Sequence, residues 1–191
     1  MVMVPGIQTV ETYQDRKILA FLGFAGPIVS VLIAASQGEL LAGTVLGKKS
    51  SDSQYAPVRR STLSAGEAIG QTVLSVTDPK VFSIGQTVSI QEADGSEVEN
   101  LGAITAKDDT TVTVTTALTA AKSSGAYIYV ADGSETALVI LNENVPNQNV
   151  AVNAEACLGG VFYTNMLVGM DALAKKALGA RVVDSVTIVP V

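Results

Sequence analysis

Residues 38–47 read GELLAGTVLG, and residues 132–143 read DGSETALVILNE. Each segment places turn-forming residues ahead of a short apolar run, which is the pattern of a turn that leads into a β-strand. Between them lie Tyr55-Ala56-Pro57 and then a long stretch of different composition. We expect the two segments to belong to one β-domain that this stretch interrupts.

The interrupting stretch, residues 62–130, is rich in Thr, Val, Ser and Gly. Residues 111–115 (TVTVT) alternate Val with Thr, which predicts a strand with one buried and one solvated face. Four further strands are expected, at residues 72–76, 87–91, 97–106 and 126–130. Five short strands at this spacing predict a small inserted β-barrel or β-sandwich whose two ends lie close together.

The flanking residues, 27–61 and 131–191, form the predicted interrupted domain. Its strands are expected at residues 29–34, 44–47, 136–141, 149–153 and 182–189, with a polar loop at 48–54. Near its end, apolar residues recur at helical spacing ahead of Gly179, which predicts one short amphipathic helix. The residues of this pattern are Leu167, Met170, Leu173, Ala174 and Leu178.

The order of these elements resembles the lambda-like bacteriophage head decoration proteins, in which an Ala-Gly-Thr-Val-Leu-Gly segment, a Tyr-x-Pro and an Asp-Gly-Ser-Glu-x-Ala segment follow one another closely. The resemblance covers about half of the chain and implies a mainly β domain of the β-clip or β-tulip kind with a short C-terminal helix. It also implies a non-enzymatic virion protein without a cofactor. Such a protein is made in the host cytoplasm and binds the outer surface of the capsid. The inserted β-domain is not part of the minimal family pattern.

The resemblance implies a capsid cement that binds the major capsid protein as a homotrimer at three-fold and quasi-three-fold sites. Residues 1–26 show no clean period and too little apolar material for a core, so we expect an extended arm that orders on a partner. The expected capsid or subunit interface combines this arm with apolar residues of the domain. Its residues are Ile18, Leu19, Phe21, Leu22, Phe24, Ile28, Val45, Tyr55, Pro57 and Ile140.

An uncharged run at residues 18–35, preceded by Arg16-Lys17, supports a competing interpretation. Its length and flank are those of a membrane helix, which would make the chain a membrane-tethered or secreted surface β-protein. Against a helix stand Gly23, the Gly26-Pro27 pair and the β-branched residues that follow. We therefore expect an extended arm followed by a buried strand from about residue 28, and we consider a membrane partner improbable.

Composition excludes several functional classes. The net charge is −6 with only 12 Lys and Arg among 191 residues, which argues against nucleic acid as a partner. His is absent, so the commonest proton-transfer group and zinc ligand is missing. Cys157 lies in a small apolar context that predicts a buried structural cysteine rather than a nucleophile. No phosphate-binding loop or nucleophile elbow is present.

Two acidic segments were weighed as sites. Residues 132–135 (DGSE) fit either a carboxylate site or a turn before a strand, and the turn is favoured, with both acids solvated. The inserted domain carries Asp94, Glu97, Glu99, Asp108 and Asp109, whose oxygens could hold a hard cation such as calcium. Their spacing matches no known calcium loop, so the sequence predicts no metal site.

Overall fold

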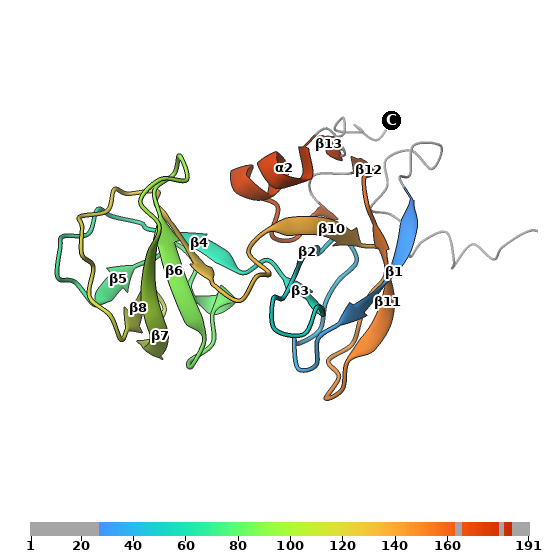
Figure 1. Ribbon diagram of the computed structural model, residues 1–191, viewed down its shortest axis with the longest axis horizontal. Coiled ribbons are helices and arrows are strands. Elements are labelled where there is room, and N and C mark those ends of the chain that lie inside the picture. Colours follow the sequence, from blue (N-terminus) through green and yellow to red (C-terminus); the bar gives the residue numbers. More distant parts are fainter. Residues whose placement is uncertain (1–26, 163–165, 180–181, 185–191) are drawn as a thin grey trace, which may run out of the picture. The chain divides into compact units, whose positions relative to one another are not determined.

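The computed structural model describes residues 27–162, 166–179 and 182–184, and it is mainly β (Figure 1). The chain divides into two compact units. Unit 1 contains the described residues up to Lys48, Asp52–Pro57, and those from Thr136 onwards; unit 2 contains Lys49–Ser51 and Val58–Glu135. The predicted insertion, residues 62–130, lies within unit 2. The structure begins this unit four residues earlier and ends it five residues later.

Unit 1 is a closed barrel of five strands in the order β1-β11-β10-β2-β3. Figure 1 shows β1 and β11 side by side, and every residue of β1 pairs antiparallel with β11. The bounds are β1, Ile28–Ile33; β2, Val45–Lys48; β3, Tyr55–Pro57; β10, Ala137–Leu141; and β11, Val152–Cys157. Its core consists of small and branched side chains from these strands and their connections: Val31, Ile33, Leu40, Leu46, Val139, Leu141, Val145, Ala154 and Ala156.

Residues 38–47 and 132–143, which are far apart in the sequence, meet in this barrel. β2 pairs antiparallel with β10, so Val45 lies opposite Ile140 and Leu46 lies opposite Val139. An isolated bridge between Leu40 and Val145 extends the contact. These strands come from either side of unit 2 in the sequence, so their pairing requires the ends of unit 2 to return to one place. A main-chain hydrogen bond of 2.8 Å from Ser50 to the Asp132 carbonyl joins those ends.

The end of the chain differs from the prediction. The helix α2 spans only Ala172–Leu178, capped by the Asp171 carboxylate, which accepts a hydrogen bond from the Ala174 amide, and ended by Gly179. Leu167 and Met170 lie before it, because Val168 is extended beside Gly43–Val45 and Gly169 has a positive φ of 78°. α2 lies against β10 and buries Ala174 and Leu178. β12 (Gly160–Phe162) and β13 (Val182–Asp184) form a separate two-stranded parallel sheet.

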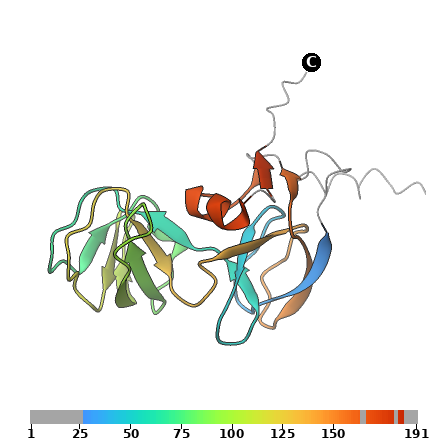
Figure 2. The same cartoon turned by 45° about the horizontal axis from the view of Figure 1, so that its top comes forward.

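Unit 2 is a six-stranded antiparallel sheet that curls until its terminal strands meet (Figures 1 and 2). Its order is β4-β9-β6-β7-β8-β5, and a bridge between Leu63 and Val76 joins the ends of β4 and β5. The bounds are β4, Arg60–Thr62; β5, Val73–Ser75; β6, Thr87–Gln91; β7, Glu99–Lys107; β8, Thr111–Val114; and β9, Tyr127–Val130, with a 3-10 turn η2 at Pro79–Val81. Its own buried cluster, including Phe82, Ile90 and Leu101, lies inside the curl.

Most of the strands appear where the sequence predicts them, and the exceptions have physical reasons. In β8, Val112 and Val114 are buried and the Thr residues are partly exposed, as the alternation predicts. β11 was predicted at residues 149–153 but begins at Val152, because it follows the full length of β1. β3, β4 and β12 were not predicted, since strands of three residues carry too little periodicity to recognise.

Candidate interaction surface

β1 is the described strand that directly follows the predicted arm, and it presents apolar side chains to solvent. Ile28 and Leu32 on its outer face are 41% and 40% exposed, whereas Val31 and Ile33 on its inner face are buried. The expectation of a buried strand here is therefore wrong for one face. A six-residue strand that closes a small barrel has only one face toward the core, so the other must be solvated or covered by a partner.

The two edges of β1 differ. One edge pairs with β11 along Ile28–Ile33 without a register shift. At the other edge, β3 pairs only at Ile33, opposite Tyr55, and the next contact is the hydrogen bond of 2.9 Å from the Ala34 amide to the Tyr55 carbonyl. Among the residues that the structure describes, no strand pairs with this edge along Ile28 to Leu32. The barrel thus closes at one end of β1 and leaves the other end open.

The predicted interface residues fall into three groups. Ile28 is exposed, and Tyr55 and Pro57 are partly buried on β3. Val45 and Ile140 are wrong as surface residues, because both are completely buried where β2 and β10 pair. The remaining five, Ile18, Leu19, Phe21, Leu22 and Phe24, lie outside the described residues.

A second group of exposed apolar side chains in unit 1 was missed. Leu41, Met166 and Val168 are 52%, 42% and 48% exposed. Val168 is held beside the turn at Gly43 by two main-chain hydrogen bonds, of 3.0 Å to the Gly43 carbonyl and 2.9 Å from the Val45 amide. No local pattern indicates this arrangement, because the helical spacing of Leu167 and Met170 predicts a different conformation for this segment.

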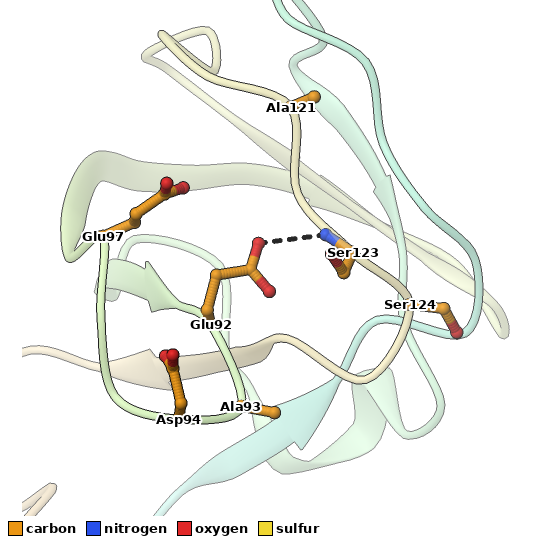
Figure 3. Close-up of a pocket in the computed structure, with 7 residues that line it drawn as sticks. All are labelled: Glu92, Ala93, Asp94, Glu97, Ala121, Ser123 and Ser124. Atoms are coloured by element: carbon orange, nitrogen blue, oxygen red, sulfur yellow. Dashed lines mark hydrogen bonds between the residues drawn. The ribbon is translucent and has the colours of Figure 1, made fainter.

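Unit 2 has an open, acidic hollow between the β6–β7 turn and residues 121–124, lined by Glu92, Ala93, Asp94, Glu97, Ala121, Ser123 and Ser124 (Figure 3). Two of its carboxylates accept main-chain hydrogen bonds, one from the facing segment and one within its own turn. Glu92 accepts a hydrogen bond of 3.0 Å from the Ser123 amide, and Asp94 accepts one of 2.8 Å from the Ser96 amide. Among the described residues, no group of three or more acidic or Cys side chains is arranged to hold a metal ion.

Lys122, which borders this hollow, is a buried cation that the sequence analysis did not single out. Its side chain is 1% exposed, and its Nζ donates a hydrogen bond of 2.9 Å to the Glu97 carbonyl and lies 3.3 Å from Glu97 Oε2. Glu99 Oε2 lies 3.9 Å from the same Nζ and accepts no hydrogen bond. A buried ammonium requires such partners, so this cluster fastens residue 122 to the start of β7.

Three titratable groups of unit 2 have shifted pKa values. Hydrogen bonds from the Thr110 amide, the Thr111 hydroxyl and the Thr111 amide lower the pKa of Asp108, which closes the β7–β8 turn. Burial raises the pKa of Tyr129, with a further rise from the charge of Glu135. Burial lowers the pKa of Arg59, and the nearby Asp132 opposes that change.

The turn interpretation of residues 132–135 is confirmed. The Gly133 amide donates to Glu135 Oε2 at 2.7 Å and the Ser134 amide donates to Asp132 Oδ1 at 3.0 Å, so both carboxylates bond to the turn itself. They are partly buried rather than solvated. Cys157 is fully buried, as expected, with its Sγ 3.6 Å from Asn142 Oδ1.

Two further findings bear on function. No helix within the described residues is long and apolar enough to cross a membrane. Comparison with models of protein families, with curated protein sequences and with solved structures found no match to this chain.

Proposed function

We propose that this protein is a structural component of a phage head: a decoration protein that binds the major capsid protein on the outer surface of the capsid and stabilises the shell. The observation that carries the proposal is the split motif of residues 38–47 and 132–143. Its two halves come from opposite sides of unit 2 and pair as neighbouring strands of one barrel. A decoration domain interrupted by an insertion requires that arrangement.

The assembled form is a homotrimer at three-fold and quasi-three-fold sites. Three copies around one axis match the symmetry of such a site, and each copy adds its own contact with the shell. Because the three contacts are linked, the effective concentration of the second and third is high once the first has formed. Weak individual contacts then give tight binding to a repeating lattice.

The features of unit 1 suit a binding protein rather than an enzyme. Its exposed apolar side chains include Ile28 and Leu32 on β1, Leu41 and Val168 beside the turn at Gly43, and Met166 and Val150. Exposed apolar groups of this kind mark contact surfaces between proteins. Contact with the shell or with neighbouring copies would bury these apolar side chains.

The test is a binding assay with mature phage capsids that lack this protein. We expect saturable binding that occupies three-fold positions in cryo-EM density. Unit 2 expressed alone is the matched control and should not bind, because the proposed contacts belong to unit 1. Density at two-fold positions, isolated single copies, or the absence of binding would contradict the proposal.

A further inference from the structure

The open edge of β1 lacks the features that keep exposed strand edges from pairing. Natural edge strands are guarded by charged side chains, Pro, bulges or short length. β1 reads IVSVLI, so it carries no charge and no Pro, and its ladder with β11 runs without a bulge. Ile28 and Leu32 add exposed apolar groups beside this edge. An edge with these properties binds another strand.

We propose that residues 18–24 of a second copy of this chain pair with the open edge of β1, and that this exchange closes the trimer. The proposal rests on the decoration function, because it assigns the subunit contact of that assembly. It makes the arm both the donor of a strand and a component of the subunit interface.

The chemistry of the edge selects this occupant. A strand added to β1 places alternate side chains beside Ile28 and Leu32 outside, and beside Val29 and Val31 on the inner side. Apart from Ser30 on the outer face, both sets of neighbours are apolar, so an added strand that is apolar on both faces fits this edge. Residues 18–25 read ILAFLGFA and carry no charge at all. Their alternate positions are apolar in both registers.

The order of donor and acceptor along the chain favours exchange between copies. The Pro27 carbonyl accepts a hydrogen bond of 3.1 Å from the Leu158 amide, so the chain is already in line with β1 one residue before the strand. In the proposed exchange, residues 18–24 leave their own barrel and reach that of the next copy. Donor and acceptor are different surfaces of one chain, which makes the contact heterologous, and a heterologous contact forms a ring where the rotation between copies closes, as it does around a three-fold axis.

The first experiment uses purified full-length protein with single cysteines and a flexible bismaleimide cross-linker. Cys157 is fully buried and stays unreactive in the folded protein. Ala20→Cys labels the arm, and Ser30→Cys labels the outer face of β1, where residue 30 is exposed. When the two variants are mixed, we expect a covalent dimer that contains one chain of each kind. A mixture of Ala20→Cys with Ser96→Cys, an exposed position of unit 2, is the control and should give none.

The double variant Ala20→Cys/Ser30→Cys separates exchange from self-pairing. Exchange in a ring predicts a ladder of cross-linked products that ends at the trimer. Products confined to single chains would show that the arm folds back on its own β1 and would overturn the proposal. The absence of mixed product in the first experiment would overturn it as well.

The second experiment introduces charged side chains beside the open edge of β1 to prevent strand pairing. Ile28→Lys with Leu32→Lys places two charges beside the edge at side chains that are already exposed, so the barrel should keep its melting temperature. We expect the mixed cross-link and the trimer to be lost. Val150→Lys, at another exposed position of unit 1, is the matched control and should retain both. If the Ile28→Lys/Leu32→Lys variant cross-links as well as the parent chain, the proposed pairing of residues 18–24 with β1 is refuted.

Binding to capsids distinguishes this inference from the proposed function. Protein that exchanges arms but does not bind heads would leave the exchange standing and remove the decoration function. Protein that binds heads as trimers but forms no cross-link between Ala20→Cys and Ser30→Cys would leave the decoration function standing and overturn the exchange.

Discussion

The conformation of β7 requires a residue without a side chain at position 102, which is Gly102. Its φ is +69°, a conformation that L side chains rarely adopt, and an added Cβ would overlap Thr115 Oγ1. Thr115 cannot turn away freely, because its Oγ1 accepts a hydrogen bond of 3.0 Å from the Ala103 amide. The bulge at this point of β7 therefore depends on glycine.

We expect Gly102→Ala to lower the free energy of unfolding of unit 2 by more than the roughly 1–2 kcal/mol that a left-handed backbone alone costs an L residue. The measurement is urea unfolding followed by circular dichroism. Gly95→Ala is the control, because its φ is +89° and its Cβ would meet nothing within 4 Å. Equal losses in the two variants would show that the Thr115 contact is unimportant.

Lys122 illustrates the energetics of a buried charge. Replacing it with Met removes the partner of the buried Glu99 carboxylate, and breaking a buried pair in this way typically costs about 3–5 kcal/mol. We expect Lys122→Met to be strongly destabilising in chemical denaturation and Lys122→Met/Glu99→Gln to recover part of the loss. Strict additivity of the two single changes would show that the residues do not interact.

Asp108 gives unit 2 a pH dependence whose sign follows from its hydrogen bonds. Its folded pKa lies below the usual 3.8, so the ionised carboxylate stabilises the fold above that pH, and this contribution disappears as the pH falls through the folded pKa. We expect the parent chain to have a higher melting temperature than the Asp108→Asn variant at pH 7, and we expect this difference to vanish in strong acid. Asp109→Asn controls for net charge. A gap that stays constant with pH would contradict the assignment.

At the scale of elements, partners determine where strands begin and end. β11 extends to Cys157 because β1 offers six residues for pairing. In unit 2, the bridge between Leu63 and Val76 brings together the ends of β4 and β5, the two terminal strands of the sheet. β1 itself is the exception, since β3 satisfies only the end of its second edge. The predicted arm, which precedes β1 in the sequence, is the partner that we propose for this edge.

Removal of residues 1–25 is the corresponding test. The described barrel contains none of these residues, so we expect the truncated protein to keep its melting temperature within a few degrees. It should no longer bind capsids lacking this protein, because the strand that joins copies or engages the shell is gone. Quantitative binding to heads measures the effect, with the full chain as control. Unchanged binding would refute a role for the arm.

At the scale of the whole molecule, each unit has its own buried cluster. Near the two ends of residues 58–135, the Val130 amide donates a hydrogen bond of 3.1 Å to the Arg59 carbonyl, and the strands of unit 1 pair across the point of insertion. These features are those of an insertion that can be removed, because adjacent ends need only a short connection.

We expect replacement of residues 58–135 by a short Gly-Ser linker to preserve folding, trimer formation and capsid binding. Unit 2 expressed alone should show a β-type circular dichroism spectrum and a cooperative melt. A deletion variant that fails to fold, together with an isolated unit 2 that melts without cooperativity, would show that the two units share one core.

Local pattern was sufficient to predict the β class, the strands with clear alternation, the turn at residues 132–135, the burial of Cys157 and the Gly179 end of the helix. These features depend on residues within a few positions of one another, where period and turn chemistry act directly. Tertiary pairing decided the rest. Val45 and Ile140 are buried where the neighbouring strands β2 and β10 pair, and Val168 is extended because Gly43 and Val45 bond to it. Among the described residues, one edge of β1 is unpaired along Ile28 to Leu32 because β3 is short. Each depends on a partner far away in the sequence, which no local pattern encodes.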